Sequence, residues 1–183
     1  MLIQGQYQSG SLVFPGSFNP IHDGHLAMAD VASRKYATKV QPEISIANVD
    51  KPDIDDADLQ RRLARVQRIG TPLVTRAARF FEKAACFPGC RFLIGADTAL
   101  RLNDPAYANH CPRQRDQCIA KIRQHGCQFV VFGRLIGHTF QDATTLPLCQ
   151  NLLAICDLVP ESDFRIDISS TQLRSMRPDQ SPP

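Results

Sequence analysis

The stretch LVFPGSFNPIHDGHLAMAD, residues 12–30, decides the fold that we expect for this chain. It begins with a short apolar run that is typical of a buried strand, and Pro15 and Gly16 end that run. A helix is expected to follow over residues 24–36. The stretch therefore predicts a strand, a glycine turn and a helix, which together form the first unit of a sheet whose strands alternate with helices.

The rest of the chain continues this alternation. Helical patterns cover residues 55–69, 76–85 and 113–125, a last short helix is expected near Ser169, and β-like runs cover residues 43–48, 72–75, 91–97, 127–134 and 152–159. Short, continuous apolar strands are typical of a parallel sheet that is covered on both faces. We therefore predict an α/β fold with a mostly parallel sheet, in which ligands lie beyond the carboxyl ends of the strands.

The clearest helix is predicted over residues 55–69. Leu59, Leu63 and Val66 fall on one face at helical spacing, and Gly70 is expected to cap the helix. The acidic residues at its start and the arginines toward its end match the helix dipole, so the arginines are interpreted mainly as a solvated face: Arg61, Arg62, Arg65 and Arg68.

The composition suits one soluble domain with a sizeable core. The chain has 183 residues, of which 43% are hydrophobic and 21% charged, and its net charge is +3. We expect residues 1–183 to form a single domain with flexible ends at 1–10 and 176–183. The small positive charge suits an anionic substrate without requiring nucleic acid, and no apolar run is long enough to span a membrane. The sequence leaves self-association open.

The seven cysteines indicate the compartment. An odd number cannot all pair within one chain, and the polar N-terminus does not resemble a secretory signal, so we expect free thiols in a reducing, cytoplasmic environment. The spacing of Cys86 and Cys90 lacks the paired pattern of structural zinc sites, and we expect no protein metal site.

The turn after the first strand carries candidate binding groups. Gly16, Ser17 and Phe18 leave the strand end, where a glycine lets backbone approach a ligand closely. His22 precedes the next helix and His25 lies in its first turn, so both imidazoles can face the helix N-terminus with its free N–H groups. These groups surround a space of anion size, as phosphoryl or nucleotidyl transfer requires.

A second candidate cluster is DISSTQLRS, residues 167–175. Ser170 and Thr171 stand where a strand end is expected to meet a helix, and Arg174 lies one turn further along. Hydroxyls, N-terminal N–H groups and a guanidinium can bind phosphate together. Taken alone, a pair of histidines at a helix start is more often structural or incidental, and a Ser-Ser-Thr sequence is more often an ordinary helix cap. Their occurrence in one α/β chain, in this order, favours a nucleotide phosphate site.

The motifs resemble those of the nucleotidyltransferase superfamily. GSFNPIHDGH, residues 16–25, is similar to its HxGH signature, and ISSTQLR, residues 168–174, is similar to its ISSTxxR motif. FLIGADT, residues 92–98, resembles the central G-x-D segment of the family. Within the superfamily the chain looks most like nicotinamide or nicotinate mononucleotide adenylyltransferases, which implies a single Rossmann-like domain and transfer of AMP from ATP with release of pyrophosphate, in NAD biosynthesis.

The resemblance also implies a role for each matching residue. His22 and His25 would bind the nucleotide phosphates, with His25 stabilising the pentacoordinate phosphorus. The backbone of Gly16, Ser17 and Phe18 would contact the α-phosphate and the acceptor. Gly95 and Asp97 would contact the adenosine ribose. Ser170, Thr171 and Arg174 would hold the β- and γ-phosphates.

The resemblance implies Mg²⁺ that is held mainly by the ATP phosphates and water, and no dedicated protein ligands are evident. The chain has no tryptophan, so an aromatic stack on a pyridine ring would come from Phe80, Phe81 or Tyr107. Three alternatives stay open: CTP as donor, another phosphorylated acceptor such as phosphopantetheine or a polyol phosphate, and a nucleotide-binding module without turnover. The chain is too short for an aminoacyl-tRNA synthetase, which has a similar histidine motif.

Overall fold

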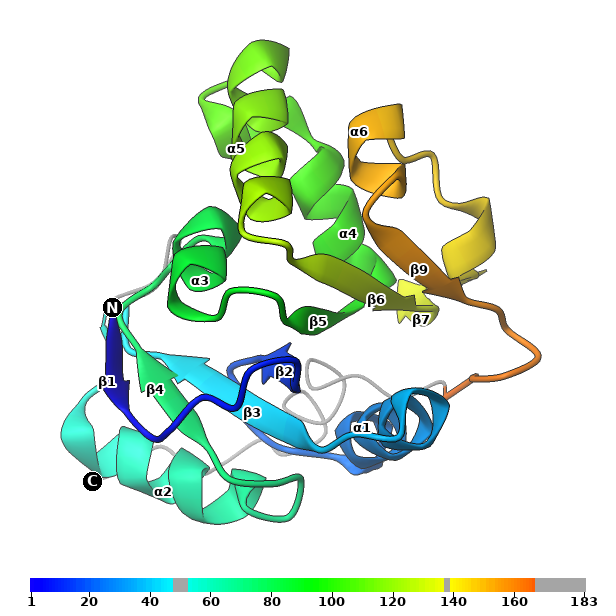
Figure 1. The fold of residues 1–183 in the computed structure, drawn as a ribbon. Coiled ribbons are helices and arrows are strands. Elements are labelled where there is room, and N and C mark those ends of the chain that lie inside the picture. Colours follow the sequence, from blue (N-terminus) through cyan, green and yellow to red (C-terminus); the bar gives the residue numbers. More distant parts are fainter. Residues whose placement is uncertain (48–52, 137–138, 167–183) are drawn as a thin grey trace, which may run out of the picture.

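A computed structural model describes residues 1–47, 53–136 and 139–166. Figure 1 shows the elements in sequence order. The strands are β1 (Leu2–Gln4), β2 (Leu12–Pro15), β3 (Val40–Ser45), β4 (Leu73–Thr75), β5 (Arg91–Gly95), β6 (Gln128–Phe132), β7 (Arg134–Ile136), β8 (Thr139–Gln141) and β9 (Cys156–Val159). The helices are α1 (Asp23–Tyr36), α2 (Asp56–Val66), α3 (Phe80–Cys86), α4 (Ala96–Asn103), α5 (Pro112–Gln124) and α6 (Gln150–Leu153), with short 3-10 turns η1 (Pro105–Ala108) and η2 (Ala143–Thr145).

Seven of the strands form one sheet in the order β1-β4-β3-β2-β5-β6-β9. Every neighbouring pair is parallel except β1 with β4. Helices α1 and α2 cover one face, and α3, α4, α5 and α6 cover the other (Figure 1). The predicted α/β architecture, with a mostly parallel sheet between two helical layers, is confirmed.

The hydrophobic core is divided by the sheet into two clusters. One contains buried residues of α3, α4, α5 and α6, and the other contains those of α1 and α2. Successive residues of β5 alternate between them: Phe92 and Ile94 join the first cluster and Leu93 the second. Burial on both faces explains why this strand is a continuous apolar run rather than an alternating one.

The order of the strands reverses between β2 and β5, at the centre of the sheet. From β2 the chain proceeds outward through β3 to β4, and it then returns to β5 on the other side of β2 and proceeds through β6 to β9. The segments that leave β2 and β5 lead to α1 and α4, which lie on opposite faces. Such a reversal opens a crevice at the carboxyl ends of the two strands, where α/β proteins bind ligands.

Strand β3 lies earlier than predicted, at Val40–Ser45 instead of residues 43–48. Gln41 and Pro42, which interrupt the apolar pattern between Val40 and Ile44, hid the start of this strand from an interpretation based on apolar runs. Glu43 has no exposed surface and forms an ion pair with Lys83 of α3 at 2.7 Å. Thr75 of β4 donates a hydrogen bond to the same carboxylate. The carboxylate is therefore tolerated in the centre of the sheet because each partner is buried with it.

Three other boundaries differ from the prediction. Helix α3 begins at Phe80, four residues later than the helix predicted over residues 76–85. The run over residues 152–159 contains the end of α6 and then β9, because a short apolar run does not distinguish a helix from a strand. The run over residues 91–97 is a strand only as far as Gly95, since α4 begins at Ala96 directly after β5. Asp97 consequently lies in the first turn of a helix.

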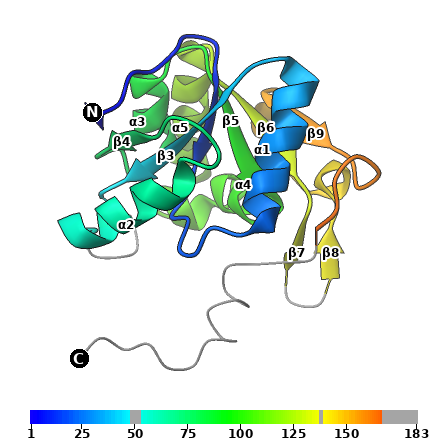
Figure 2. The same ribbon diagram turned by 90° about the horizontal axis from the view of Figure 1, so that it is seen from below.

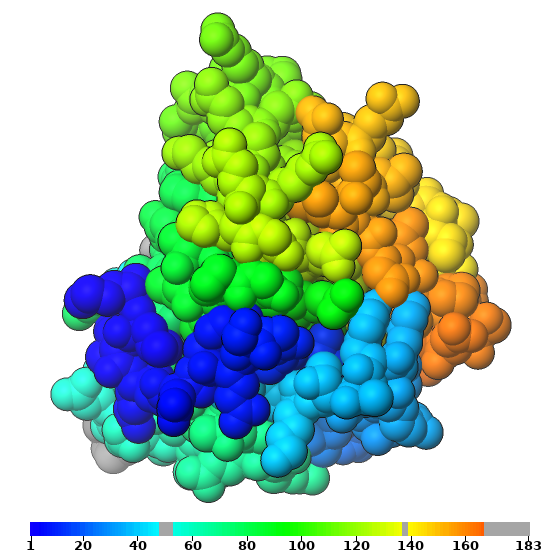
Figure 3. Space-filling model, viewed as in Figure 1, coloured from blue at the N-terminus to red at the C-terminus, as the bar shows by residue number. Residues whose placement is uncertain are grey.

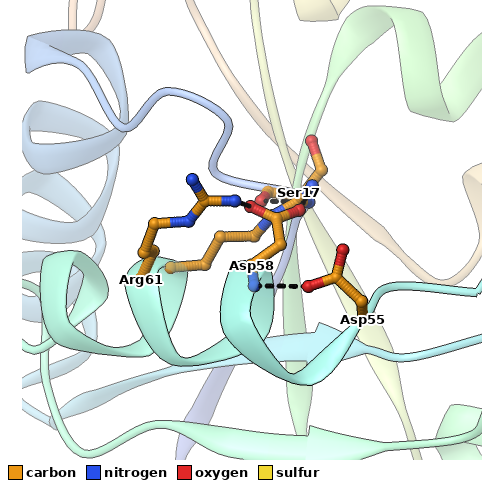
Figure 4. Close-up of polar contacts among 5 residues, drawn as sticks. Ser17, Asp55, Asp58 and Arg61 are labelled. Carbon is orange, nitrogen blue, oxygen red and sulfur yellow. Dashed lines mark hydrogen bonds and ion pairs between the residues drawn. The ribbon is translucent and has the colours of Figure 1, made fainter. Parts of the chain in front are cut away.

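Helix α2 confirms the predicted apolar face, since Leu59, Leu63 and Val66 are all buried. Asp55 caps the helix by accepting a hydrogen bond from the backbone N–H of Asp58 at 2.7 Å (Figure 4), a contact of a kind that contributes about 1 kcal/mol. The C-terminal cap is Gln67, so the prediction that Gly70 caps the helix is wrong. A Cβ at position 70 would lie 2.1 Å from the carbonyl oxygen of Val40, so glycine is required there by a close backbone approach.

The N-terminal segment contains an edge strand within the range that we expected to be flexible. Leu2–Gln4 forms β1 and pairs with β4, and the dark-blue segment lies on the surface against green residues in Figure 3. The seven cysteines are free thiols, as predicted. In the described residues no helix has both the length and the apolar character needed to cross a membrane.

Candidate functional site

The turn after β2 is anchored by a buried aromatic ring. Phe18 is 1% exposed, and its ring packs edge-on against Phe14 at 5.3 Å and against His25 at 5.2 Å between centroids. A Cβ at Gly16 would lie 3.0 Å from the Phe18 ring, which explains the glycine. The N–H of Gly16 donates to the carbonyl of Glu43 at 3.0 Å. The Phe18 side chain is thus part of the core, and a ligand can be offered only the backbone of the turn.

His22 and His25 lie together at the start of α1, as the sequence predicts. Their ring centroids are 3.8 Å apart. The backbone N–H of His22 donates to Nδ1 of His25 at 3.2 Å, so a neutral His25 carries its proton on Nε2. Both ring nitrogens of His22 are buried and have no hydrogen-bond partner within the described residues. Unpaired buried ring nitrogens are costly, so this arrangement suits a site that a ligand completes.

Burial and neighbouring groups lower the pKa values of both histidines, so both are neutral at pH 7. Burial, then the neighbouring His22, then Arg134 lower the pKa of His25 to about 3. Burial and Arg134 lower the pKa of His22 from its ordinary value, and the nearby Asp23 only partly opposes this. The imidazoles therefore offer hydrogen bonds rather than charge.

Arg134 carries a positive charge near both histidines, since it lowers both of their pKa values, and the sequence interpretation did not single it out. It begins β7, just past the carboxyl end of β6, at the base of the β7–β8 hairpin that projects from the sheet in Figure 2. Its Nη1 atom donates to both carboxylate oxygens of Asp97 at 2.9 Å each. A polar residue just beyond a predicted parallel strand was the available signal, but the interpretation assigned residues 127–134 to the strand itself.

The predicted ribose contacts, Gly95 and Asp97, lie at the end of β5 and the start of α4. A Cβ at Gly95 would lie 2.7 Å from Oδ1 of Asp97 and 3.5 Å from Cδ of Arg134, so the two side chains cover this glycine closely. The side chains of Asp97 and Arg134 are each about one third exposed. The structure therefore brings Gly95, Asp97 and Arg134 together and couples Arg134 electrostatically to the histidine pair.

The predicted triphosphate residues Ser170, Thr171 and Arg174 lie outside the described residues. The approach to the first three is described as far as Ile166. A Cβ at Gly24, between the two histidines, would lie 3.7 Å from Cγ2 of Ile166. The chain therefore passes beside the start of α1 immediately before residue 167.

The three aromatic candidates for a ring stack line one cavity of about 210 Å³ between α3, α4, η1 and α5. Phe80 packs edge-on against Phe92 and Phe129 and belongs to the core. Phe81 lies below Lys121, and Tyr107 is 46% exposed with Arg101 over its ring. Tyr107 is therefore the most exposed of the three rings, whereas Phe80 and Phe81 are both half-buried against the core.

Helix α4 contributes residues both to the strand-end site and to this cavity. Asp97 of its first turn pairs with Arg134, while the next residue, Thr98, lines the cavity with Arg79 and Arg101. A larger hollow of about 580 Å³ lies between α5 and α6, lined by residues such as Arg113 and Asn151. None of the predicted site residues lines this second hollow.

Comparison with known proteins identifies the family of the chain and a solved structure with a similar fold. A family model described as Cytidylyltransferase-like matches residues 13–176. Among solved structures, the chain is similar to the nicotinic acid mononucleotide adenylyltransferase of Plasmodium falciparum complexed with NaAD, with a TM-score of 0.51 and 12% identity, covering 92% of this chain and 83% of that one. At that identity the similarity shows the fold alone. The sequence matches no curated protein.

Proposed function

The chain belongs to the cytidylyltransferase-like family and is a nucleotidyltransferase, and from this premise we propose that it transfers AMP from ATP to nicotinamide or nicotinate mononucleotide. The products are the dinucleotide and pyrophosphate. One observation carries the proposal: the neutral pair His22 and His25 and the ion pair of Asp97 and Arg134 occupy the carboxyl ends of neighbouring strands at the reversal of the sheet.

The histidine pair is the proposed site of the α-phosphate. The Nε2–H of His25 and the single ring N–H of neutral His22 donate to non-bridging oxygens, whose negative charge grows as the acceptor phosphate attacks in line. The chain forms no covalent intermediate in this scheme. Its contribution is to hold the two phosphates in line and to stabilise the developing charge.

The adenosine and the leaving group occupy the neighbouring positions. Asp97 accepts hydrogen bonds from the ribose hydroxyls, and the backbone at Gly95 permits that approach. Arg134, released from Asp97, pairs with a phosphate. Ser170, Thr171 and Arg174 are the proposed ligands of the β- and γ-phosphates, and Arg174→Ala should chiefly raise the KM for ATP.

Mg²⁺ is proposed to arrive with the triphosphate. Among the described residues, no group of three His, Cys, Asp or Glu side chains could hold a metal ion, and Asp97 is paired with Arg134. This donor set fits a metal that is coordinated mainly by phosphates and water. The metal would neutralise triphosphate charge, and the chain's own residues perform every other task.

The aromatic cavity is the proposed acceptor site. Tyr107 and Phe81 offer ring faces to a pyridine, and Arg79 and Arg101 give the cavity a positive charge that suits an anionic acceptor. Because Thr98 of α4 lines the cavity directly after Asp97, an acceptor in it would lie beside the nucleotide.

A panel of donors and acceptors tests the proposal. The purified chain is mixed with Mg²⁺, with ATP or CTP, and with each of four acceptors: nicotinamide mononucleotide, nicotinate mononucleotide, phosphopantetheine and glycerol phosphate. We expect pyrophosphate release with ATP and a pyridine mononucleotide. Release only with CTP, or only with another acceptor, would replace the substrate assignment, and silence across the panel would favour a binding module without turnover.

A further inference from the structure

One arginine of α2 differs from its neighbours. Arg61, Arg65 and Arg68 are exposed, as expected for a solvated face, but the side chain of Arg62 is only 13% exposed, against 68% for Arg61. The interpretation of all four arginines as a solvated face is therefore wrong for Arg62. Both Arg61 and Arg62 contact Asp58.

Arg62 also reaches the turn after β2. Its Nη1 atom donates to the backbone carbonyl of Ser17 at 3.0 Å, while its Nη2 atom pairs with Asp58. Figure 4 shows the Arg61 side chain reaching Asp58 on α2, with Ser17 of the strand-end turn beyond Asp58. The guanidinium therefore links one carboxylate of α2 to one peptide of the turn.

That peptide has a defined consequence for ligand binding. The bond between Ser17 and Phe18 is trans and planar, so its N–H points opposite to its carbonyl. With the Ser17 carbonyl directed at Arg62, the N–H of Phe18 points away from α2. This N–H has no hydrogen-bond partner within the described residues, although Phe18 is buried. A donor of this kind is available to a ligand oxygen.

The turn needs an external contact to keep this orientation. Phe18 has φ +46°, in the left-handed region that costs a bulky residue roughly 1–2 kcal/mol. Rotating the peptide by half a turn would return Phe18 to the extended region and would place the Ser17 carbonyl where the N–H now points. A carbonyl oxygen there would repel a phosphate oxygen.

We propose that Arg62 is a positioning residue that holds the Ser17–Phe18 peptide so that the N–H of Phe18 is presented to a substrate phosphate, with Asp58 orienting the guanidinium. This inference rests on the proposed function, because it requires a nucleotide phosphate at the turn. Arg62 itself does not touch the substrate. It acts through the direction of one peptide.

The test compares Arg62→Met with Arg61→Met, since the two arginines are adjacent, share Asp58 and differ in the contact with Ser17. Methionine keeps most of the apolar stem. We expect Arg62→Met to lower kcat for pyrophosphate release by about 10- to 100-fold, the range expected when a reacting group is misplaced, and Arg61→Met to stay within about 2-fold. Arg62→Lys, which retains a donor, should regain about 3-fold or more over Arg62→Met.

Two further measurements distinguish a failure of this inference from a loss of the fold and from a failure of the proposed function. Thermal unfolding of each variant shows whether the fold is intact, and if Arg62→Met does not fold, Arg62→Lys and Asp58→Asn take its place with an expected intermediate loss. ATP binding by calorimetry requires no turnover: about a 5-fold weaker Kd for Arg62→Met than for Arg61→Met supports the inference even if every acceptor fails. Equal kcat and equal Kd for the two variants would overturn it, and so would a wild-type chain that binds no ATP.

Discussion

Nη1 of Arg134 donates to both carboxylate oxygens of Asp97 at 2.9 Å, and this ion pair ties the start of β7 to the first turn of α4. The same arginine lowers the pKa values of His22 and His25. The cation thus links the predicted ribose contact to the predicted phosphate contacts. In the proposed reaction, the nucleotide replaces Asp97 as the partner of Arg134.

Arg134→Met should therefore weaken ATP binding. We expect the KM for ATP to rise about 10-fold, the effect of losing one charged hydrogen bond, while Arg34→Met on the exposed face of α1 changes it little. The pKa values of His22 and His25 should rise in Arg134→Met, because a nearby positive charge is gone. NMR titration of the imidazole protons measures this shift, and an unchanged KM for ATP would argue against the role of Arg134.

The histidine pair should make stability fall in mild acid. The pKa of His25 is about 3 in the folded chain and its ordinary value is 6.5, so between these values the unfolded chain binds the additional proton. The free energy of unfolding should decrease as the pH falls through this window. His25→Asn, which removes the titration, should show a smaller decrease. Urea unfolding at pH 7, 6, 5 and 4 compares the two chains, and parallel curves would contradict the burial of a neutral His25.

Removing one partner of the buried pair Glu43 and Lys83 should lower the free energy of unfolding more than replacing both partners. Lys83→Met leaves a carboxylate with no exposed surface beside an apolar side chain, and should destabilise the fold by about 3–5 kcal/mol. Adding Glu43→Gln should recover part of that loss. Lys35→Met, which breaks an exposed ion pair with Asp157, should cost less than about 1 kcal/mol. Urea unfolding measures these losses of free energy. Equal losses for Lys83→Met and Lys35→Met would show that the buried pair contributes no more to stability than the exposed one.

If the aromatic cavity binds the acceptor, a change in the cavity should alter the KM for the acceptor and not the KM for ATP. Tyr107→Ala should raise the KM for the acceptor about 10-fold, as expected for loss of one stacking contact, and leave the KM for ATP unchanged. Tyr107→Phe keeps the ring and should behave like the wild type. A rise in the KM for ATP of similar size would place the nucleotide, rather than the acceptor, in this cavity.

Local patterns were sufficient for the parts of the fold that depend on one element. The strand, glycine turn and helix of residues 12–30 follow from an apolar run, Gly16 and the helical spacing behind it, and the face of α2 follows from Leu59, Leu63 and Val66. The early start of β3 could not be predicted, because Gln41 and Pro42 interrupt its apolar pattern, and Gln41 is acceptable in a buried strand only through its contact with Ser11, thirty residues earlier.

The candidate site likewise contains residues that a local motif predicts and residues that only the tertiary structure reveals. His22 and His25 carry a motif, so their proximity was expected from their spacing at a helix start. Arg134 and Arg62 carry no motif, and their importance arises from contacts with Asp97 and Ser17 that lie far away in the sequence. Such contacts depend on the tertiary arrangement of the strands and helices.

Replacement of His25 is the most direct test of the central claim, that the imidazole pair at the start of α1 stabilises the transfer of the α-phosphate. With ATP and the active acceptor, His25→Ala should release pyrophosphate about 10²- to 10³-fold more slowly than the wild type, as when one preorganised donor is removed. His125→Ala, which removes an exposed histidine at the end of α5, should remain close to the wild type. A near-normal rate for His25→Ala would contradict the account.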